Sequence, residues 1–477
     1  MREVKKIIDP AFNDHEYARI VGEVKRFLEK WSLDADFRKA YDAQPEQTLA
    51  QSGLDVDPET ARLLTDTQTA REKIKAIKEG RDSAESLPEK YLLYKHFIME
   101  KLCSRNEMRT QTCVPSEPRL KNWRDRQEKR CRLSFGTQSL GMVQAVVMFE
   151  LSQGCSVGCP FCGFSAKKLS GVFRYTEENA ALWRAILKYL HAFLGDAAGS
   201  GACYCASEGL DNPDYEKLID DFYHEFGIVP QLTTAASTRN VERTRALLRY
   251  GRERYPHIDR FSVLNAEMRD KIFESFTLEE LLLVELLPQF PEAPASHLTK
   301  TGRNWKPEQG EEAESTIACA SGFVINMQEK SIRLVTPFPT DSAHPTGEWM
   351  LEKRFFENAA DFESKITGLI EKYMPQRLAL SAVCGSVDKF GLEKKDGKVW
   401  VSGRAVCAPL LASALTQETL DRLLLLLEKR SMTGYEILSD LLEDDSVDAA
   451  HALLLIKTLW KYGLVDTAAF GETQPQE

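Results

Sequence analysis

Three cysteines in one short loop are the residues of this sequence best suited to chemistry. Cys155, Cys159 and Cys162 follow the spacing Cys-x3-Cys-x2-Cys. Soft thiolates at such short spacing favour an iron-sulfur cluster, zinc or copper(I) over hard cations. A four-iron cluster needs four ligands and this loop offers three. One iron would therefore stay open, and an open coordination position is where a metal site does chemistry.

The alternative is a structural zinc site that takes its fourth ligand from elsewhere in the chain. Structural zinc usually shows a second pair of ligands at short spacing. The chain has eight histidines, none of them near the loop, and no second Cys-x2-Cys pair. The spacing therefore favours the iron-sulfur cluster.

The loop carries an aromatic residue, Phe161, directly before its third cysteine. This pattern resembles the cluster loop of the radical S-adenosylmethionine (radical SAM) enzymes. The resemblance implies that the three cysteines hold a [4Fe-4S] cluster, with Phe161 beside the cofactor. It also implies that the open iron chelates the amino and carboxylate groups of S-adenosyl-L-methionine (SAM), which an electron from the cluster cleaves to a 5′-deoxyadenosyl radical.

Other polar residues stand where radical SAM enzymes hold SAM. Glu208 takes the place of the family's ammonium-binding glutamate, in a turn where Ser207 replaces the first glycine. A carboxylate suits an ammonium through a charge-assisted hydrogen bond. Thr234, Ser262 and Asn265 end predicted strands and match positions that face the carboxylate and ribose of SAM. Each of these three would also serve as an ordinary strand-end cap.

Alternating strand and helix patterns surround these residues. Residues 142–152 are predicted to form a strand buried on both faces that delivers the cysteine loop at its carboxyl end. Further strands are expected over 201–207, 229–234 and 259–265, with helices over 176–194, 213–226 and 240–250. This order predicts right-handed crossovers and a parallel α/β sheet. The radical SAM resemblance makes it a partial (β/α) barrel, open on one side.

At 477 residues the chain exceeds the size of a single hydrophobic core, so several units are expected. We expect a helical N-terminal region over 1–115, the partial barrel over 116–300, an α/β layer closing the barrel over 301–412 and a winged-helix-like domain over 413–477. A hairpin turning at Asp396-Gly397 is predicted near the end of the third unit. The basic run from Arg119 to Arg132 is predicted to be a solvated helix face.

Residues 31–56 resemble the leader of nitrile-hydratase-like peptide precursors, although an ordinary helix pair capped at Gly53 is the alternative. With the barrel, the Gly-Phe-x-x-Asn-Met strand at 322–327 and the Thr-Pro turn at 336–337, the chain resembles the proteusin-type peptide epimerases. That resemblance implies partners: a precursor peptide with a leader sequence, and a flavodoxin- or ferredoxin-like electron donor.

The epimerase resemblance also implies a second hydrogen donor. The deoxyadenosyl radical takes the Cα hydrogen of an L-residue, and a thiol on the opposite face returns a hydrogen to give the D-residue. Cys384 is the favoured thiol because it precedes a glycine at a predicted strand end, ahead of Cys319 and then Cys205. Two other readings stay open: another radical SAM peptide modification, such as crosslinking or excision, and a metal-stabilised peptide-binding protein without catalysis.

Composition narrows the functional classes. Lys plus Arg is 62 and Asp plus Glu is 72, a net charge of -10 that argues against a general nucleic-acid binder. The start has no uninterrupted apolar segment, and no run reaches the ~18 apolar residues of a membrane span. Eleven cysteines at irregular spacing fit a reducing compartment. We therefore expect a cytoplasmic protein without a membrane partner.

Overall fold

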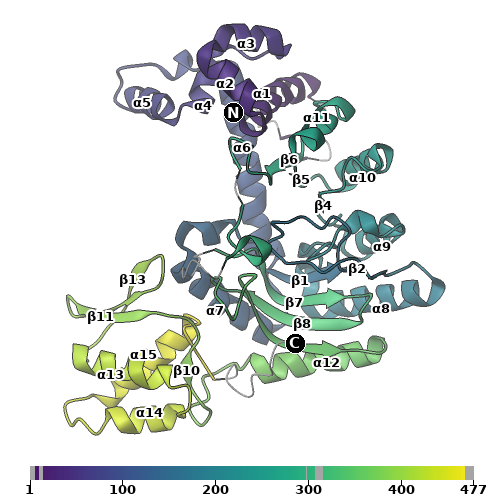
Figure 1. Cartoon of the computed structure of the whole chain (residues 1–477). Helices are drawn as coiled ribbons and strands as arrows, with labels where there is room; N and C mark the ends of the chain where they lie inside the picture. The colour runs from purple at the N-terminus through teal and green to yellow at the C-terminus, as the bar shows by residue number, and fades with distance from the viewer. Residues whose placement is uncertain (1–5, 10–13, 297, 307–314, 468–477) are drawn as a thin grey trace.

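The computed structural model describes residues 6–9, 14–296, 298–306 and 315–467. It is a mixed α/β structure with several small sheets, and no closed barrel occurs among the residues described. The ends of the two outer predicted domains, residues 1–5 and 468–477, lie outside these ranges. N-terminal helices occupy one end of the molecule, and a separate C-terminal unit lies at the other (Figure 1).

None of the helices traced in the described ranges is both long enough and apolar enough to cross a membrane.

The N-terminal region is helical. Aspartates 34, 57 and 66 begin helices by accepting hydrogen bonds from backbone amides of the first turn. Val24, Phe27, Tyr41 and Leu49 form its buried core. The elements are α1 (His15–Leu33), α2 (Ala35–Ala43), α3 (Pro45–Ser52), α4 (Pro58–Thr65), α5 (Thr67–Lys78), the short helix η1 (Ala84–Ser86), α6 (Glu89–Glu107) and the π-helical turn η2 (Met108–Thr112).

The basic run forms helix α7 (Pro118–Phe135), and the prediction that it is a solvated face is wrong for three of its arginines, whereas Lys121, Lys129 and Arg132 are exposed. Arg124, Arg126 and Arg130 are each at most 4% exposed. Arg124 donates to the backbone oxygen of Gln144, and Arg130 donates to that of Pro337. Carbonyls at loop ends accept these donors, so the arginine stems pack in the interior. The short helix η3 (Gly136–Gly141) follows.

A four-stranded sheet lies at the centre, in the order β1-β7-β8-β9. Strand β1 (Ala145–Glu150) is buried along its whole length, as its apolar run predicted. Strand β7 (Ala320–Asn326) pairs with it in parallel. The strands β8 (Ser331–Pro337) and β9 (Glu348–Phe355) continue the sheet in antiparallel fashion, and helix α12 (Ala359–Tyr373) packs against them.

The segment 201–207, expected as a strand, forms no regular strand. It follows the short helix η4 (Gly195–Ser200) and joins β1 by two backbone bonds: Phe149 N to Ala202 O at 2.8 Å, and Cys205 N to Phe149 O at 3.2 Å. The positive φ of Ala206, 46°, bends the chain before a ladder can extend. The segment still lies beside the strand that leads into the cysteine loop.

A second sheet is parallel, in the order β4-β5-β6. It consists of β4 (Thr233–Thr234), β5 (Asp259–Val263) and β6 (Val284–Pro288). Helices α8 (Glu177–Leu194), α9 (Tyr215–Phe226), α10 (Val241–Arg254) and α11 (Ala266–Ser275) lie along one side of the strands (Figure 1). The short elements β2 (Ser152–Gln153), β3 (Gly171–Val172), η5 (Gly209–Asp211) and η6 (Gly302–Asn304) lie between them in the chain. Strand and helix alternate here as predicted.

The C-terminal unit has its own hydrophobic core. The antiparallel sheet β11 (Gly391–Lys395), β12 (Lys398–Ser402) and β13 (Cys407–Ala412) precedes helices α13 (Gln417–Glu428), α14 (Gly434–Leu441) and α15 (Ala449–Lys461), and β10 (Gly385–Ser386) pairs with β14 (Val465–Asp466). The hairpin turns at Asp396-Gly397, both with positive φ, as predicted. Leu392, Val399 and Val401 pack with the helices. Packing therefore groups β11–β13 with the helices, whereas the expected boundary fell at 412.

Candidate functional site

The cysteine loop begins where the central sheet ends. After β1 and β2 the chain turns at Gly154, where φ is 82° and an added Cβ would lie 2.5 Å from the oxygen of Lys168. Only glycine fits this close approach. Cys155 N donates to Lys167 O at 2.9 Å, and Leu169 N donates to Cys155 O at 3.2 Å. The loop is thus closed at its base and presents its thiols beyond the strand end.

The three thiols are half-buried and free of disulfides. The thiol of Cys159 contacts Cys162, and this contact, with backbone amides of Phe164 and Ala166, lowers the pKa of Cys162 to about 5. The same contact raises the pKa of Cys159. Burial raises the pKa of Cys155, although its sulfur accepts from the amide of Val157 at 3.4 Å.

These donors fit an iron-sulfur cluster by their chemistry. Within the described ranges, no three Cys, His, Asp or Glu side chains already form a group that could hold a metal ion. Backbone amides point at the sulfurs of Cys155 and Cys162, as hydrogen bonds to cluster sulfurs do. Cys155, Cys159 and Cys162 would therefore be the ligands of such a cluster.

Glu208 is a buried carboxylate held by neutral donors. It is 3% exposed. Thr234 Oγ1 donates to its Oε1 at 2.7 Å, Leu210 N donates to the same oxygen at 3.1 Å, and Ala235 N donates to Oε2 at 2.9 Å. Burial is the main cause of its raised pKa, and no ion pair to Glu208 occurs among the residues that the structure describes. A buried carboxylate without a paired cation is a candidate site for a cationic ligand.

The Glu208 turn is fastened to the cysteine loop. Ser156 N donates to Asp211 Oδ2 at 2.8 Å, and the hydroxyl of Ser156 donates to the other oxygen of that carboxylate. Arg239 completes the contact: its Nη1 donates to Ser156 Oγ at 2.6 Å and pairs with Asp211 at 3.2 Å. The turn and the loop therefore form one assembly, although more than forty residues of sequence separate them.

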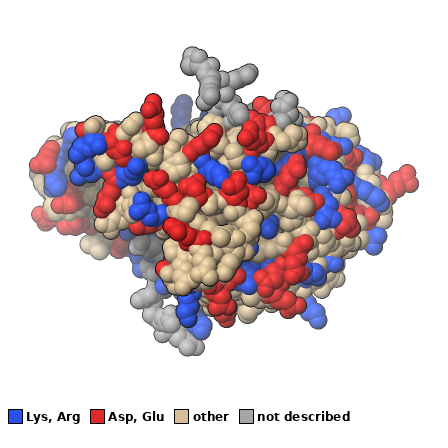
Figure 2. All heavy atoms as spheres, turned by 90° about the horizontal axis from the view of Figure 1, so that it is seen from above, with Lys and Arg blue, Asp and Glu red and all other residues tan. Residues whose placement is uncertain are grey.

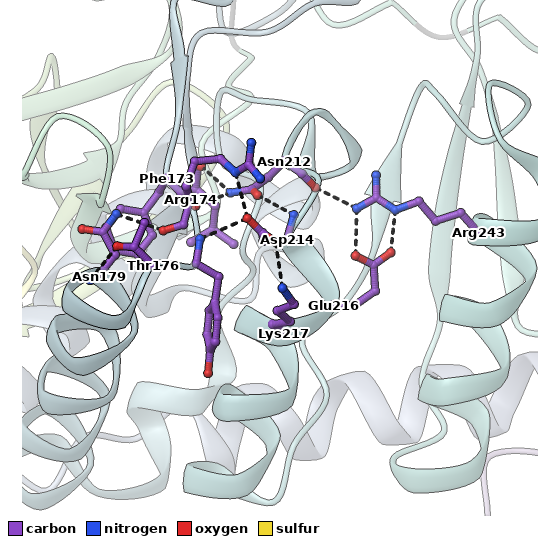
Figure 3. Close-up of polar contacts among 11 residues, drawn as sticks. Phe173, Arg174, Thr176, Asn179, Asn212, Asp214, Glu216, Lys217 and Arg243 are labelled. Carbon is purple, nitrogen blue, oxygen red and sulfur yellow. Dashed lines mark hydrogen bonds and ion pairs between the residues drawn. The ribbon is translucent and has the colours of Figure 1, made fainter.

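Asn212 joins this assembly to the sheet. Its side-chain amide donates to the backbone oxygens of Leu151, at 3.0 Å, and Phe173, at 2.7 Å. It is fully buried, so each bond meets a polar group that water cannot reach. Its side-chain oxygen accepts from Asp214 N at 2.9 Å. Figure 3 shows how this asparagine and Asp214 draw the flanking segments together.

The other residues predicted to face SAM lie near strand ends. Thr234 contacts Glu208 directly, so the structure brings these two predicted residues together. Ser262 lies half-buried on β5. Asn265 is exposed and accepts from Met268 N at 2.8 Å as the cap of α11, the ordinary role considered for it. Phe161 is half-buried within the loop. Roles for Ser262, Asn265 and Phe161 toward a cofactor stay predictions.

The candidate thiols divide between two hydrophobic clusters. Cys384 is fully buried in the core of the C-terminal unit, where burial raises its pKa to about 12. Cys205 and Cys319 instead pack in what we call the sheet-face cluster, which includes Met148 of β1 and Phe164 of the cysteine loop. Cys319 is half-buried and Cys205 is buried. The structure therefore brings Cys205 and Cys319, and not Cys384, to the loop.

Two residues that position the loop were missed from the sequence. Arg239 contacts Ser156, and Arg303 donates to the oxygen of Cys159 at 2.8 Å. Asp211 and Asn212 also help to position the loop. They lie in the same turn as Glu208, so their closeness to Glu208 in the sequence could have indicated this role. No pattern around Arg303 marks it, because its partners are backbone carbonyls far away in sequence.

Comparison with known proteins finds a relative that shares most of the chain. The protein named "Uncharacterized protein y4wI" of Sinorhizobium fredii (strain NBRC 101917 / NGR234) is 32% identical over 376 residues, covering 75% of this chain and 71% of the relative. No protein-family model matches the chain. No solved structure matches it either.

Proposed function

The chain belongs to the y4wI protein family, and we propose that it is a radical SAM peptide epimerase. It would convert L-residues to D-residues in a ribosomally made precursor peptide. The observation that carries this proposal is the buried carboxylate of Glu208, which accepts from the neutral hydroxyl of Thr234 and whose turn is bonded through Asp211 and Ser156 to a loop of three cysteines. SAM is both an amino acid and a sulfonium compound. A loop of thiols that can hold a reducing cluster, next to a carboxylate that can bind an ammonium, would suit both parts of that molecule.

The chain's own residues would divide the work as follows. Cys155, Cys159 and Cys162 would hold the [4Fe-4S] cluster, which with bound SAM supplies a 5′-deoxyadenosyl radical. Glu208 would bind the SAM ammonium, with Thr234 fixing the rotamer of that carboxylate through its 2.7 Å hydrogen bond. Ser262, Asn265 and Phe161 would contact other parts of SAM.

Inversion also requires a thiol. Its S–H bond breaks as a hydrogen atom passes to the planar Cα radical, forming the new C–H bond and leaving a thiyl radical. One electron from a flavodoxin- or ferredoxin-like donor and one proton from solvent would restore the thiol. Cys384 was favoured from sequence, but Cys319 and Phe164 of the cysteine loop pack against the same hydrophobic cluster, which supports Cys319 more strongly.

The finer architecture belongs to this proposal. We propose that β1, segment 202–205 and strands β4–β6 together act as a partial (β/α) barrel, and that the sheet β11–β13 with helices α13–α15 acts as a winged-helix-like unit. That unit would bind the leader of the precursor. Strand β13 is the edge of its sheet and pairs only with β12 among the described strands, which supports binding by strand addition.

The proposed function is tested on protein that is purified and reconstituted without oxygen. We expect the reconstituted protein, given dithionite and SAM, to release 5′-deoxyadenosine. Coexpression with its precursor in heavy water should then add one deuteron per altered residue and no other mass. A loss of two hydrogens would instead indicate crosslinking, and a protein that binds zinc and leaves SAM intact would contradict the proposal.

A further inference from the structure

A distant strap lies across the cysteine loop. The strap consists of residues 301–303, which contain the start of η6. The backbone amide of Arg303 donates to Cys162 O at 3.0 Å. Its guanidinium donates to Cys159 O at 2.8 Å through Nη1, and to Ala166 O through Nη2. One arginine thus bonds three carbonyls of the loop, from a position 144 residues after Cys159.

The strap and the loop meet backbone to backbone. An added Cβ on Gly302 would lie 2.3 Å from Gly163 O and 2.5 Å from Cys162 O. An added Cβ on Gly163 would lie 2.8 Å from Thr301 Oγ1. Both glycines are needed for this approach, because any side chain would push the strap away. Thr301 is fully buried and Gly302 N donates to Pro345 O at 2.6 Å, so the strap is itself anchored.

The loop depends on outside partners for its shape. Between Cys155 and Ala166 it contains no helix or strand, so its carbonyls have no regular ladder to accept them. Asp211 and Arg239 hold it at Ser156, toward its start. Arg303 holds it at Cys159, Cys162 and Ala166, which bracket the second and third thiols. The planar fork of an arginine fixes the separation of two acceptors in a way that a lysine does not.

The guanidinium also brings charge to the thiols. Its Nη1 lies 2.8 Å from the backbone oxygen of Cys159, so the positive charge lies next to the segment that carries Cys159 and Cys162. Near a metal cluster the same charge would stabilise the more negative, reduced state.

We propose that Arg303 is a positioning residue that holds the three-cysteine loop in its ligand-ready shape and raises the reduction potential of the bound cluster. The second half of this statement rests on the proposed function, and the first half does not.

The shape is tested on the full chain without metal. Hydrogen-deuterium exchange should show that Arg303→Gln speeds exchange of the amides over 155–169 by about tenfold, as expected from losing about 1.4 kcal/mol of local hydrogen bonding. Arg245→Gln is the matched control, since Arg245 also bonds a backbone oxygen, that of Ser275. Equal exchange in the parent and Arg303→Gln would overturn the positioning role.

The potential is tested on the reconstituted protein. Arg303→Gln should shift the cluster's midpoint potential to a more negative value, whereas Arg303→Lys should keep the parent's potential but not its slow amide exchange. An unchanged potential in Arg303→Gln would overturn the electrostatic role. If the parent takes up no iron, the proposed function fails, while the exchange experiment still decides whether Arg303 holds the loop.

Discussion

At the scale of single residues, Glu208 is the side chain whose environment is most informative. Three neutral donors satisfy it, and burial raises its pKa. We predict that Glu208→Gln weakens SAM binding about 10- to 100-fold, because a charge-assisted hydrogen bond contributes about 1.5–3 kcal/mol. Equilibrium dialysis of the reconstituted protein measures this. Glu178→Gln, an exposed change on α8, should leave binding intact. Equal affinities for all three proteins would remove Glu208 from the site.

The thiols give a second prediction at this scale. Cys319 and Phe164 of the cysteine loop pack against the same hydrophobic cluster, whereas Cys384 lies in the core of the C-terminal unit. We therefore expect Cys319→Ala to abolish deuterium incorporation at Cα while 5′-deoxyadenosine release continues. Cys384→Ala should still invert residues. The opposite result would restore the preference that the sequence suggested.

At this scale the sequence could indicate only those residues whose neighbours in the chain carry the signal. The three cysteines, Glu208 and Thr234 could be singled out because their spacing or strand-end position carries the signal, and the structure brings Thr234 to Glu208. The strap could not be predicted, because Arg303 binds backbone carbonyls, and every residue has one. The placement of Cys384 was also beyond reach, because only the packing of the C-terminal unit reveals that its strand end faces a core.

At the scale of elements, the turn after Glu208 joins the cysteine loop to helices α8 and α9. Asp214 accepts from Arg174 Nε at 2.8 Å and from the amide of Tyr175 at 3.1 Å (Figure 3). These bonds lower the pKa of Asp214 to about 2. The pKa of an aspartate in the unfolded chain is about 4. Because the pKa of Asp214 in the folded protein is lower, its ionised form contributes its full stabilisation above pH ~4. That contribution is lost as the pH falls toward about 2.

We predict a stability difference between the parent and Asp214→Asn that becomes smaller as the pH falls. Asp214→Asn should unfold at lower urea than the parent at neutral pH, and the gap should close between pH ~4 and ~2. Circular dichroism at several pH values measures it. Asp445→Asn, an exposed change near α15, should show little gap at any pH. A gap that persists unchanged in acid would mean that the Arg174 contact does not depend on charge.

Helix α7 shows where pattern reasoning at this scale fails. Its basic residues favour a solvated face, yet Arg124, Arg126 and Arg130 are buried. The carbonyl of Gln144 accepts from Arg124 and that of Pro337 accepts from Arg130, whereas Arg126 stacks over the ring of Trp460 at 4.2 Å. Those partners come from three other segments. Charge patterning in one segment cannot anticipate acceptors that only the tertiary fold supplies.

At the scale of the whole molecule, α7 joins the central sheets to the C-terminal unit. Leu133 of α7 packs in the core of that unit. Ser134 Oγ donates to Asp388 Oδ2 at 2.6 Å, and Arg404 Nε donates to Asp388 Oδ1 at 3.0 Å. Acidic and basic side chains are interspersed on the face seen in Figure 2, and neither sign gathers into one stripe there.

Asp388 is therefore predicted to hold the two parts together. It is 4% exposed, so Asp388→Ala removes a buried acceptor from both Ser134 and Arg404. Breaking such a buried pair costs about 3–5 kcal/mol. Urea unfolding should show this loss, with faster proteolysis before β10, while the exposed Asp445→Ala stays close to the parent. A stability equal to the parent's would show that the joint rests on apolar packing alone.

The central proposal is that the cysteine loop binds an iron-sulfur cluster. The most direct measurement is the iron and sulfide content of the chain after anaerobic reconstitution, beside a variant in which Cys155, Cys159 and Cys162 are all alanine. We predict about four iron and four sulfide per parent chain, an electron paramagnetic resonance signal that changes on adding SAM, and neither property in the variant. A parent that holds zinc or no metal, or a variant that keeps the same cluster, would contradict the account.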